Sequence, residues 1–319
     1  EVGAAVHRQE GKGRIPGHVG EDHELLVALT PQQKRIAIDG NPIDRLGMLW
    51  GRLNAVLFTP ADLAIIQLGP GQRRQFLDTT LSQVSQTYLH HLQRYSHALR
   101  QRNALLRMRR PLGELSEQFE VWEAQMAPSA IEVSRARAAH VDRLGSRLTL
   151  HYAAIAGAGG APTPAERLSA RYSGFIRSRE ELESPAAIDL YADRLRRSRA
   201  DDAERAATFA GPHRDDIAFE IEGRDLRQFG SQGQQRSAIV ALRLAEVETM
   251  TQSAGETPVL LLDDIIAELD PARTAAFLRL LAALPVQTFL TTTDLGAVEK
   301  HIAVARRWRV RQGAYDLED

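Results

Sequence analysis

The 319-residue sequence contains no cysteine, and aromatic residues make up only 6% of it. The absence of cysteine excludes disulfide bonds and zinc sites built on thiolates. No apolar run approaches the roughly 20 residues that a membrane-spanning helix needs. No secretory leader is visible at the start of the sequence. We therefore expect a cytoplasmic protein that has no membrane partner.

A strong net charge is also absent, because 40 lysine and arginine residues face 41 aspartate and glutamate residues. The overall composition therefore does not announce a nucleic-acid-binding protein, and any basic surface must be local. Apolar residues make up 43% and charged residues 25% of the chain. Both values are ordinary for a soluble globular protein.

Apolar periodicity divides the chain into three parts. Residues 1–75 predict short antiparallel strands and one buried strand, whereas residues 76–205 are mostly helical. Residues 206–319 alternate short apolar strands with helices, which is typical of a parallel sheet. The sequence thus predicts an α/β protein with a helical insertion. The expected helices span 42–53, 115–144, 165–183, 185–199 and 235–250, and the expected strands include 55–58, 217–221, 259–262, 286–290 and 308–310.

The sharpest motif is an apolar strand from Val259 to Leu262 that ends in the paired acids Asp263 and Asp264. This is the Walker B arrangement, and it makes both acids candidate catalytic residues. A buried strand places them at the carboxyl edge of a parallel sheet, where α/β proteins bind ligands. Asp263 is the candidate metal ligand and would hold Mg²⁺ through water, because Mg²⁺ dehydrates reluctantly. Asp264 would orient or deprotonate the attacking water.

A second segment, from Phe229 to Ser237, directly precedes a predicted helix. It places a hydroxyl, small residues and backbone N–H groups at a helix N-terminus, which favours anion binding. Alone, this segment is more often a capped glycine turn, and the acidic strand end alone is as often an ordinary buried strand. Together they have the order and spacing of the ABC-type ATPases: signature, helix, Walker B and an acid-containing D-loop.

Further strings make the chain resemble the RecF family of bacterial recombination mediators. They lie between residues 57 and 294 in the family's order, so the resemblance covers most of the chain. GPHRDD at 211–216 and QRNALL at 101–106 are specific to that family and are not general to ABC-type ATPases. The other matching strings are LFTPADL at 57–63, GP at 69–70, RRQFLD at 73–78 and TTTD at 291–294.

The resemblance implies an ABC-type P-loop ATPase head with an inserted helical arm, and ATP and Mg²⁺ as cofactors. It implies nucleotide bound between two heads, where one head's signature contacts the γ-phosphate held by the other through Ser231, Gln232, Gly233 and Gln234. Glu268 and Asp270 belong to the D-loop, and Thr293 occupies the switch position. The implied activity is ATP-driven homodimerisation on DNA with slow hydrolysis, which aids recombinase loading at gaps. The implied partners are single-strand/double-strand DNA junctions, RecO and RecR.

One motif of that family is missing from the sequence. No G-x-x-x-x-G-K-[ST] loop occurs, and Gly11-Lys12-Gly13 is too short and precedes no helix. In the family this Walker A loop lies near the N-terminus, so we expect the head to be incomplete there. We expect the missing strand and helix to belong beside the Walker B strand. Their absence should leave part of the parallel sheet uncovered and make the chain poorly soluble. Ala267 also stands where a D-loop serine is usual.

A local basic helix is the candidate DNA contact. From Thr79 to Gly113 the chain has no acidic residue, and the same stretch carries six arginines. Such a helix fits sequence-independent, salt-sensitive binding of the phosphate backbone. Any single arginine here is slightly more often a solvated or ion-paired side chain than a DNA ligand. The candidates are Arg100, Arg107 and Arg110.

Two other classes of protein remain open. One is another ABC-type ATPase, either a chromosome-organising ATPase or a transporter subunit. The arm is too short and interrupted for a long coiled coil, and a transporter subunit should lack the RecF strings. The other is a non-enzymatic scaffold that uses only the dimer surface. The codons upstream of Glu1 distinguish an ATPase from a scaffold, because an in-frame Walker A loop there would favour an enzyme.

We predict that the purified 319-residue chain hydrolyses no ATP, because the lysine and hydroxyl that grip phosphate and Mg²⁺ are not among its residues. A phosphate-release assay with and without Mg²⁺ measures this directly. Magnesium-dependent turnover above the no-protein rate would overturn the prediction.

Overall fold

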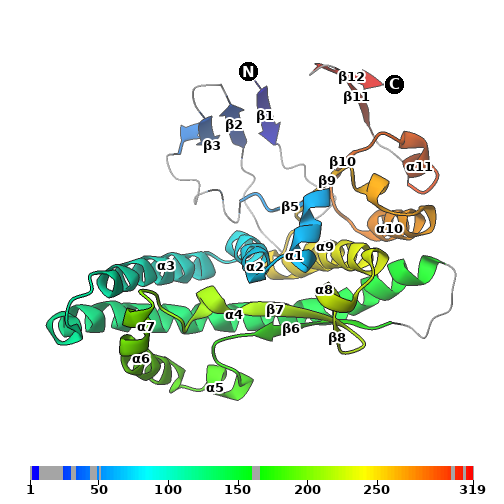
Figure 1. Ribbon diagram of the computed structural model, residues 1–319. Helices are drawn as coiled ribbons and strands as arrows, with labels where there is room; N and C mark the ends of the chain where they lie inside the picture. The colour runs from blue at the N-terminus through cyan, green and yellow to red at the C-terminus, as the bar shows by residue number, and fades with distance from the viewer. Residues whose placement is uncertain are drawn as a thin grey trace.

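A computed structural model gives the arrangement of the chain. It describes residues 2–6, 24–29, 34–43, 49, 52–159, 166–302, 306–311 and 314–318. These residues form an α/β head and a long helical arm that extends from it (Figure 1). No helix within these ranges is long and apolar enough to cross a membrane. Gly11-Lys12-Gly13 lies outside them.

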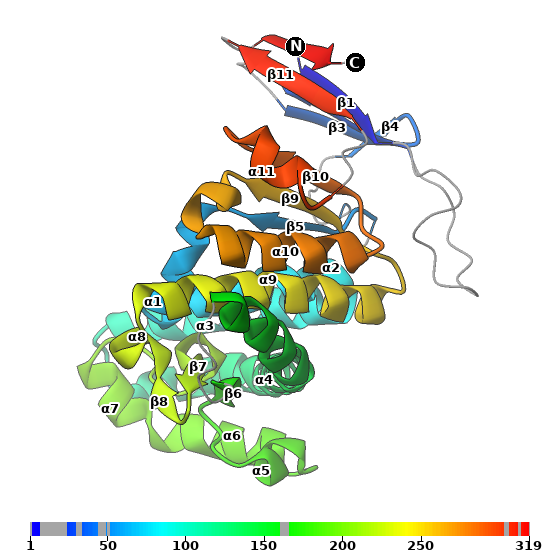
Figure 2. The ribbon, with the colours of Figure 1, turned by 90° about the vertical axis from the view of Figure 1, so that its right-hand side faces the viewer.

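A parallel sheet of three strands, in the order β10-β9-β5, lies at the centre of the head. Strand β9 (Val259–Asp263) runs between β5 (Ala55–Phe58) and β10 (Thr288–Thr291). Helices α9 (Gln232–Ala254) and α10 (Pro271–Ala283) lie on one side of this sheet (Figure 2). The predicted α/β class is therefore confirmed, although β10 begins two residues later than expected.

The central place of β9 corrects one expectation. Because β9 pairs with β5 along one edge and with β10 along the other, no further strand can pair beside the Walker B strand. An apolar row crosses all three strands in register and is partly exposed: Leu57 is 52% exposed, Phe289 is 46% exposed, and Leu261 lies between them. Parallel sheets are normally covered on both faces, so this partly exposed apolar row is an exception to that rule.

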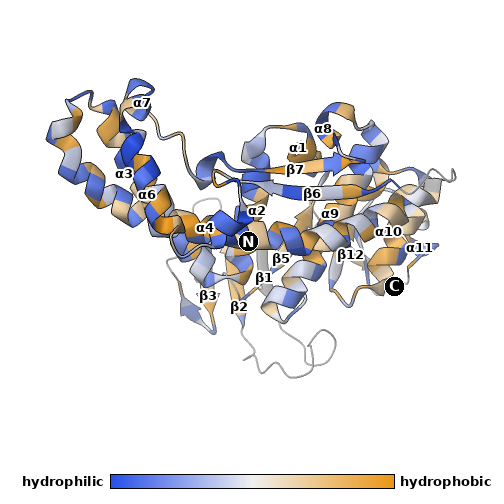
Figure 3. Cartoon of the chain, turned by 90° about the horizontal axis from the view of Figure 1, so that it is seen from below, coloured by the Kyte–Doolittle hydropathy of each residue, from blue (hydrophilic) through white to orange (hydrophobic). Residues whose placement is uncertain are grey.

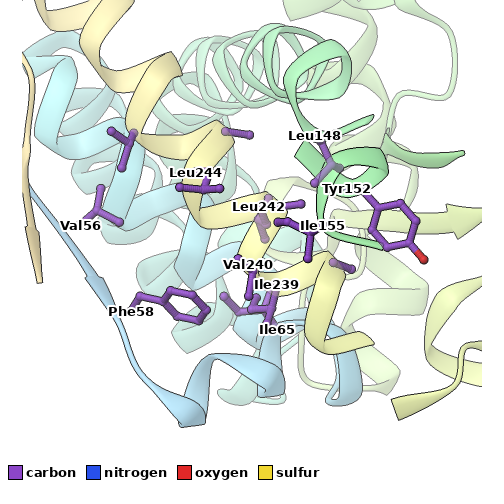
Figure 4. Close-up of a cluster of buried hydrophobic side chains, with 14 of the residues drawn as sticks. Val56, Phe58, Ile65, Leu148, Tyr152, Ile155, Ile239, Val240, Leu242 and Leu244 are labelled. Carbon is purple, nitrogen blue, oxygen red and sulfur yellow. The ribbon is translucent and has the colours of Figure 1, made fainter. Parts of the chain in front are cut away.

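Helix α9 forms the core of the head because it is covered from two directions. Its buried residues include the consecutive run from Ala238 to Leu242, so no polar stripe divides it. Val56 and Phe58 pack against it from the sheet (Figure 4). Helix α4 (Ser116–Ala156) packs along it over many residues and adds Leu148, Tyr152 and Ile155 to the same core.

The arm is built on an antiparallel pair of helices, α3 (Gln86–Arg107) and α4 (Figure 1). Helix α4 has 41 residues and is therefore about 60 Å long. It continues twelve residues past the end predicted from the sequence, because its last turns bury apolar side chains against α9. One continuous helix thus joins the arm to the head. Helix α6 (Ala187–Arg197) packs against α4 and continues into α7 (Arg199–Glu204).

The helix expected at 165–183 is wrong. Residues Leu168–Ser173 form strand β6, which pairs antiparallel with β7 (Asp216–Ile221), and only α5 (Arg179–Glu183) is helical. Leu168, Ala170 and Tyr172 alternate along β6 and pack against the core of the head, and this period of two suits a strand. The β6–β7 pair crosses the division predicted near residue 206, and that division stays a prediction.

The ends of the chain form small antiparallel sheets. The meander predicted for the first forty residues is confirmed, with the strand order β1-β2-β3-β4. The helix predicted at 42–53 lies mostly outside the described residues. The last expected strand is β11 (Arg307–Arg311), and its partner β12 (Ala314–Glu318) was not predicted. The meander strands are β1 (Val2–Val6), β2 (Leu25–Leu29), β3 (Lys34–Ile38) and β4 (Asn41–Pro42).

Short elements complete the framework. Helix α2 leads from the head into the arm, and α8 immediately precedes the glycine-containing segment before α9. The bounds of these elements are α1 (Ala64–Gln67), α2 (Pro70–Val84), α8 (Leu226–Phe229), α11 (Leu295–Glu299) and β8 (Arg224–Asp225).

A buried polar network, which we call the junction network, joins α2, α4 and β7. Its centre is Arg137 of α4, which is 2% exposed. The guanidinium donates to the carboxylate of Asp78 (2.7 Å) and to the carbonyl of Pro212 (2.6 Å). Burial opposes the charge on Arg137, but neighbouring oxygens outweigh it and hold the pKa above its ordinary value.

The GPHRDD string supplies the other half of the junction network. Asp215 accepts hydrogen bonds from the hydroxyls of Ser134 (3.1 Å) and Tyr172 and from the N–H of Phe175 (2.7 Å). Burial raises the pKa of Asp215, and these hydrogen bonds partly offset that effect. Asp216 receives a two-pronged ion pair from Arg73 (2.6 and 2.9 Å). The matching strings RRQFLD and GPHRDD therefore meet here as structural partners.

A second buried cation holds the arm together. Arg102 of the QRNALL string is fully buried and contacts the carboxylates of Glu123 (3.0 Å) and Asp202 (2.8 Å). It also donates to the hydroxyl of Thr208 (2.7 Å) and to the carbonyl of Leu195 (3.0 Å). One side chain thus ties α3 to α4, α6, α7 and the segment after α7.

We predict that Arg102→Met lowers the free energy of unfolding by about 3–5 kcal/mol, because two buried carboxylates lose a partner. Urea denaturation followed by circular dichroism measures the change. Arg100→Met is the matched control: it removes the same charge from an exposed position of the same helix and should stay within about 0.5 kcal/mol of the original protein. Equal midpoints for the two variants would contradict the structural role of Arg102.

Candidate functional site

The two acids of the Walker B strand lie exposed at the carboxyl edge of the central sheet. In the parallel register, Asp263 of β9 lies beside Thr291 of β10. The Thr291 hydroxyl donates to the Asp263 carboxylate (2.7 Å) and accepts from the N–H of Asp264 (3.1 Å). Thr291 therefore fixes the orientation of both acidic residues. Thr291 is the first residue of the TTTD string, but its position in the sequence does not reveal this role.

The chain turns sharply immediately after β9. Asp264 has φ +52° and ψ +30°, in the left-handed region that aspartate tolerates better than most residues. This turn starts the short helical segment Ile265–Glu268, whose two isoleucines return to the core. Thr293 lies exposed two residues beyond β10. The predicted acids and the predicted switch residue therefore follow neighbouring strands at one sheet edge.

The donor set at this edge fits a shared magnesium ion better than a protein-only cage. Within the described ranges, no group of three or more histidine, cysteine, aspartate or glutamate residues could hold a metal. Mg²⁺ is commonly bound by one or two carboxylates, with water and substrate phosphates completing its shell. Among the described residues only Thr291 donates to Asp263, so that carboxylate keeps oxygen lone pairs for the metal. The residues present therefore fit a Mg²⁺ ion that arrives with a phosphate ligand.

The signature segment begins helix α9 with a complete capping box. The Ser231 hydroxyl accepts from the N–H of Gln234 (3.2 Å), and the Gln234 side chain accepts from the N–H of Ser231 (2.7 Å). This pairing leaves the N–H groups of Gln232 and Gly233 in the first turn without acceptors inside the helix. Two N–H donors, the Ser231 hydroxyl and the positive end of the helix dipole thus lie together, an arrangement that favours an anion.

The side chain of Gln235 stabilises the loop that precedes helix α9. This residue is buried and its amide nitrogen lies within hydrogen-bonding distance of the carbonyls of Leu226 (3.2 Å), Arg227 (3.4 Å) and Gly230 (3.3 Å). Its amide oxygen accepts from Gln67 (2.9 Å). The sequence motif includes Gln235 but does not reveal this role, because its partners are backbone carbonyls and a distant side chain.

Glu166 connects the signature to the arm helix. One carboxylate oxygen accepts from the side chain of Gln234 (3.0 Å), and the other accepts from the hydroxyl of Tyr152 on α4 (2.9 Å). Burial and the neighbouring carboxylate raise the pKa of Tyr152, so its hydroxyl stays protonated and donates. The long arm helix therefore reaches the signature through a single side chain. Nothing in the sequence pattern had marked Glu166.

Ion pairs connect the signature helix to the predicted D-loop. Arg236 lies 3.2 Å from Glu268, and Asp270 caps α10 while pairing with Arg273 (2.8 Å). The pKa of Asp270 is lowered, first by the Arg273 N–H and further by the charge of that side chain. A Cβ on Gly233 would lie 2.9 Å from the Arg273 guanidinium. Glycine therefore lets α10 approach the signature closely.

The three candidate DNA contacts are all exposed on the arm. Arg107 donates to the carbonyl of Asn103 (3.1 Å), and Arg110 is ion-paired with Glu114 (2.6 Å). The structure thus places all three on the surface and shows that Arg110 has an acidic neighbour. Their contact with DNA stays a prediction. Arg102, in the same stretch, is structural.

Comparison with known proteins agrees with this geometry. No family model matches the chain. The RecF protein of Citrifermentans bemidjiense is 36% identical over 303 residues, which cover 94% of this chain and 80% of that protein. The RecF protein of Symbiobacterium thermophilum is 38% identical over 340 aligned positions, covering 99% and 87%. Both relatives are named as DNA replication and repair proteins.

A solved structure of the recombination mediator RecF with ATP, from the RecFOR pathway, superposes with a TM-score of 0.80 at 27% identity, covering 93% of this chain and 76% of that one. The fold and the ordered motifs define an ABC-type ATPase head with an inserted arm. The chain belongs to the RecF family of DNA replication and repair proteins. A transporter subunit and a chromosome-organising ATPase are therefore set aside.

Proposed function

We propose that this protein acts in recombinational DNA repair and replication as an ATP-dependent switch that dimerises on DNA and hydrolyses ATP slowly. The observation that carries the proposal is the capped, exposed N-terminus of α9, joined by the Arg236–Glu268 ion pair to the segment after Asp263 and Asp264. An anion site and a metal-binding edge are thus fixed relative to each other. The RecF structure solved with ATP supports ATP as the ligand.

The residues divide the work between two copies of the head. Asp263 would hold Mg²⁺ on its own head, and Asp264 would orient the attacking water. Ser231 and the N–H groups of Gln232 and Gly233 receive the γ-phosphate of the nucleotide held by the second copy, while Gln234 keeps the cap in place. Because each signature completes the other head's site, nucleotide binding stabilises the dimer. Bound Mg²⁺ neutralises phosphate charge during hydrolysis.

DNA is the proposed macromolecular partner, bound without sequence preference near single-strand/double-strand junctions. Arg100 and Arg107 support this because they are exposed along the same helix and have no carboxylate within ion-pair distance in the described chain. The RecF structure that resembles this chain belongs to the RecFOR pathway, which supports RecO and RecR as partners in recombinase loading at gaps.

We expect Ser231→Asp to weaken ATP-dependent dimerisation at least tenfold in the protein expressed from its complete reading frame. Aspartate keeps the helix cap but places a negative charge beside the partner's phosphate. Ser231→Thr is the matched control, because it keeps both the cap and the hydroxyl. Sedimentation velocity with and without ATP and Mg²⁺ measures the association.

Unchanged circular dichroism for both variants shows that α9 is intact. Equal dimerisation of the aspartate and threonine variants would refute the role of Ser231 across the dimer. Dimerisation without any turnover would favour the non-enzymatic scaffold instead.

A further inference from the structure

An exposed aromatic ring with two arginines against it lies between α7 and β7, away from the candidate nucleotide site. We call it the Phe209 cluster; it consists of Arg205, Phe209 and Arg214. The guanidinium carbons of Arg205 and Arg214 lie 4.9 Å and 4.6 Å from the centroid of the Phe209 ring. All three side chains are exposed, and the ring keeps 43% of its surface accessible.

The positive charge of this cluster is not neutralised locally. Neither Arg205 nor Arg214 has a carboxylate within 4 Å in the described chain, although the exposed residues Asp201 and Glu204 are close in sequence. Some other exposed arginines of the arm do have acidic partners, as Arg110 and Arg196 show. The cluster therefore offers two free guanidinium groups beside an accessible ring.

The backbone that carries the cluster is held rigidly. The N–H of Phe209 donates to buried Asp202 (3.1 Å), and the N–H of Thr208 donates to Asn103 on α3 (2.9 Å). The ring of His213 bonds to the carbonyl of Thr208 (2.8 Å) and to the hydroxyl of Tyr95. Gly211, at φ +142°, is required because a Cβ would lie 2.4 Å from the Tyr95 hydroxyl. A rigid platform loses little entropy when it binds a ligand.

The GPHRDD string contains one charged residue, Arg214, that takes no part in the internal contacts of the other charged residues. Its histidine and both aspartates are bonded within the junction network or to neighbouring backbone. Arg214 is the member of the string whose charged side chain is exposed and makes no ion pair among the described residues. Burial lowers the pKa of His213, so His213 adds no charge near neutral pH. The structural needs of the string therefore do not explain Arg214.

We propose that the Phe209 cluster is a binding surface for single-stranded DNA. The two guanidiniums pair with backbone phosphates, and an unpaired base stacks on Phe209 or on the arginine beside it, as sequence-independent single-strand sites do. Helix α7 lies beside α3, the helix of Arg100 and Arg107 (Figures 1 and 3). A strand leaving a duplex held along the arm can thus reach the cluster. The inference deepens the proposed DNA-binding function and rests on it.

Fluorescence anisotropy with labelled oligothymidylate and with a blunt duplex of equal length tests the proposal. For Arg205→Gln/Arg214→Gln we expect weaker oligothymidylate binding, with a salt slope smaller by about 1.4, or about 0.7 for each phosphate contact. For Phe209→Leu we expect about a tenfold loss on oligothymidylate, in line with one lost stacking contact, and less than a twofold loss on the duplex.

The matched control is Arg171→Gln/Arg196→Gln, which removes the same charge from exposed arginines that already have acidic partners. Urea unfolding of every variant checks that the fold is kept. Control-like behaviour of the cluster variants would overturn the inference, and so would an equal loss on both DNAs for Phe209→Leu. If the wild-type protein binds neither DNA, the proposed function itself fails and the inference fails with it.

Discussion

The burial of Arg137 is the constraint around which the head and the arm are assembled. An arginine that is 2% exposed costs several kcal/mol to bury unless oxygens surround it. Here they come from α2, through Asp78, and from the segment before β7, through the carbonyl of Pro212. Asp215 anchors the same junction from the other side by accepting from α4 and β6. The arm therefore packs against the head through buried polar contacts and is not joined to it by the chain connections alone.

The same rigidity reaches the candidate site. Helix α4 passes through the junction network and carries Tyr152 in its last turns, where the Tyr152 hydroxyl donates to Glu166, which in turn accepts from Gln234 of the signature. On the other side, Arg236 and Arg273 connect the signature to the segment after the Walker B acids. Any displacement of the arm relative to the head must stretch one of these contacts. The structure thus offers a physical route by which the arm and the signature segment influence each other.

The sequence predicted what depends on local pattern. The apolar run before Asp263 and Asp264 and the capped turn before α9 are both found where the residues indicated. The sequence failed where partners lie far apart in the chain. The local pattern predicts a helix where strand β6 lies, because the partner strand that stabilises β6 is more than forty residues away in the chain. The end of α4 was placed too early because only packing against α9 stabilises its last turns.

The candidate site shows the same limit. Thr291 and Glu166 orient predicted residues, but each does so from another strand or loop, so no spacing rule points to them. The basic stretch around Arg102 illustrates the opposite error. Its composition suggested a local DNA-binding helix, whereas Arg102, the one arginine of the QRNALL string, is buried among carboxylates. Solvent exposure distinguishes a structural arginine from a candidate DNA contact, and the sequence alone does not predict the exposure of a single side chain.

Native-state hydrogen exchange on the Arg137→Met variant tests the central claim, that one buried cation makes the head and the arm a single cooperative unit. If the claim holds, amides of α4 and β7 lose protection together, by about the same 3–5 kcal/mol that breaking a buried ion pair costs. Loss confined to the turn of α4 around residue 137, with β7 protected as before, would contradict it.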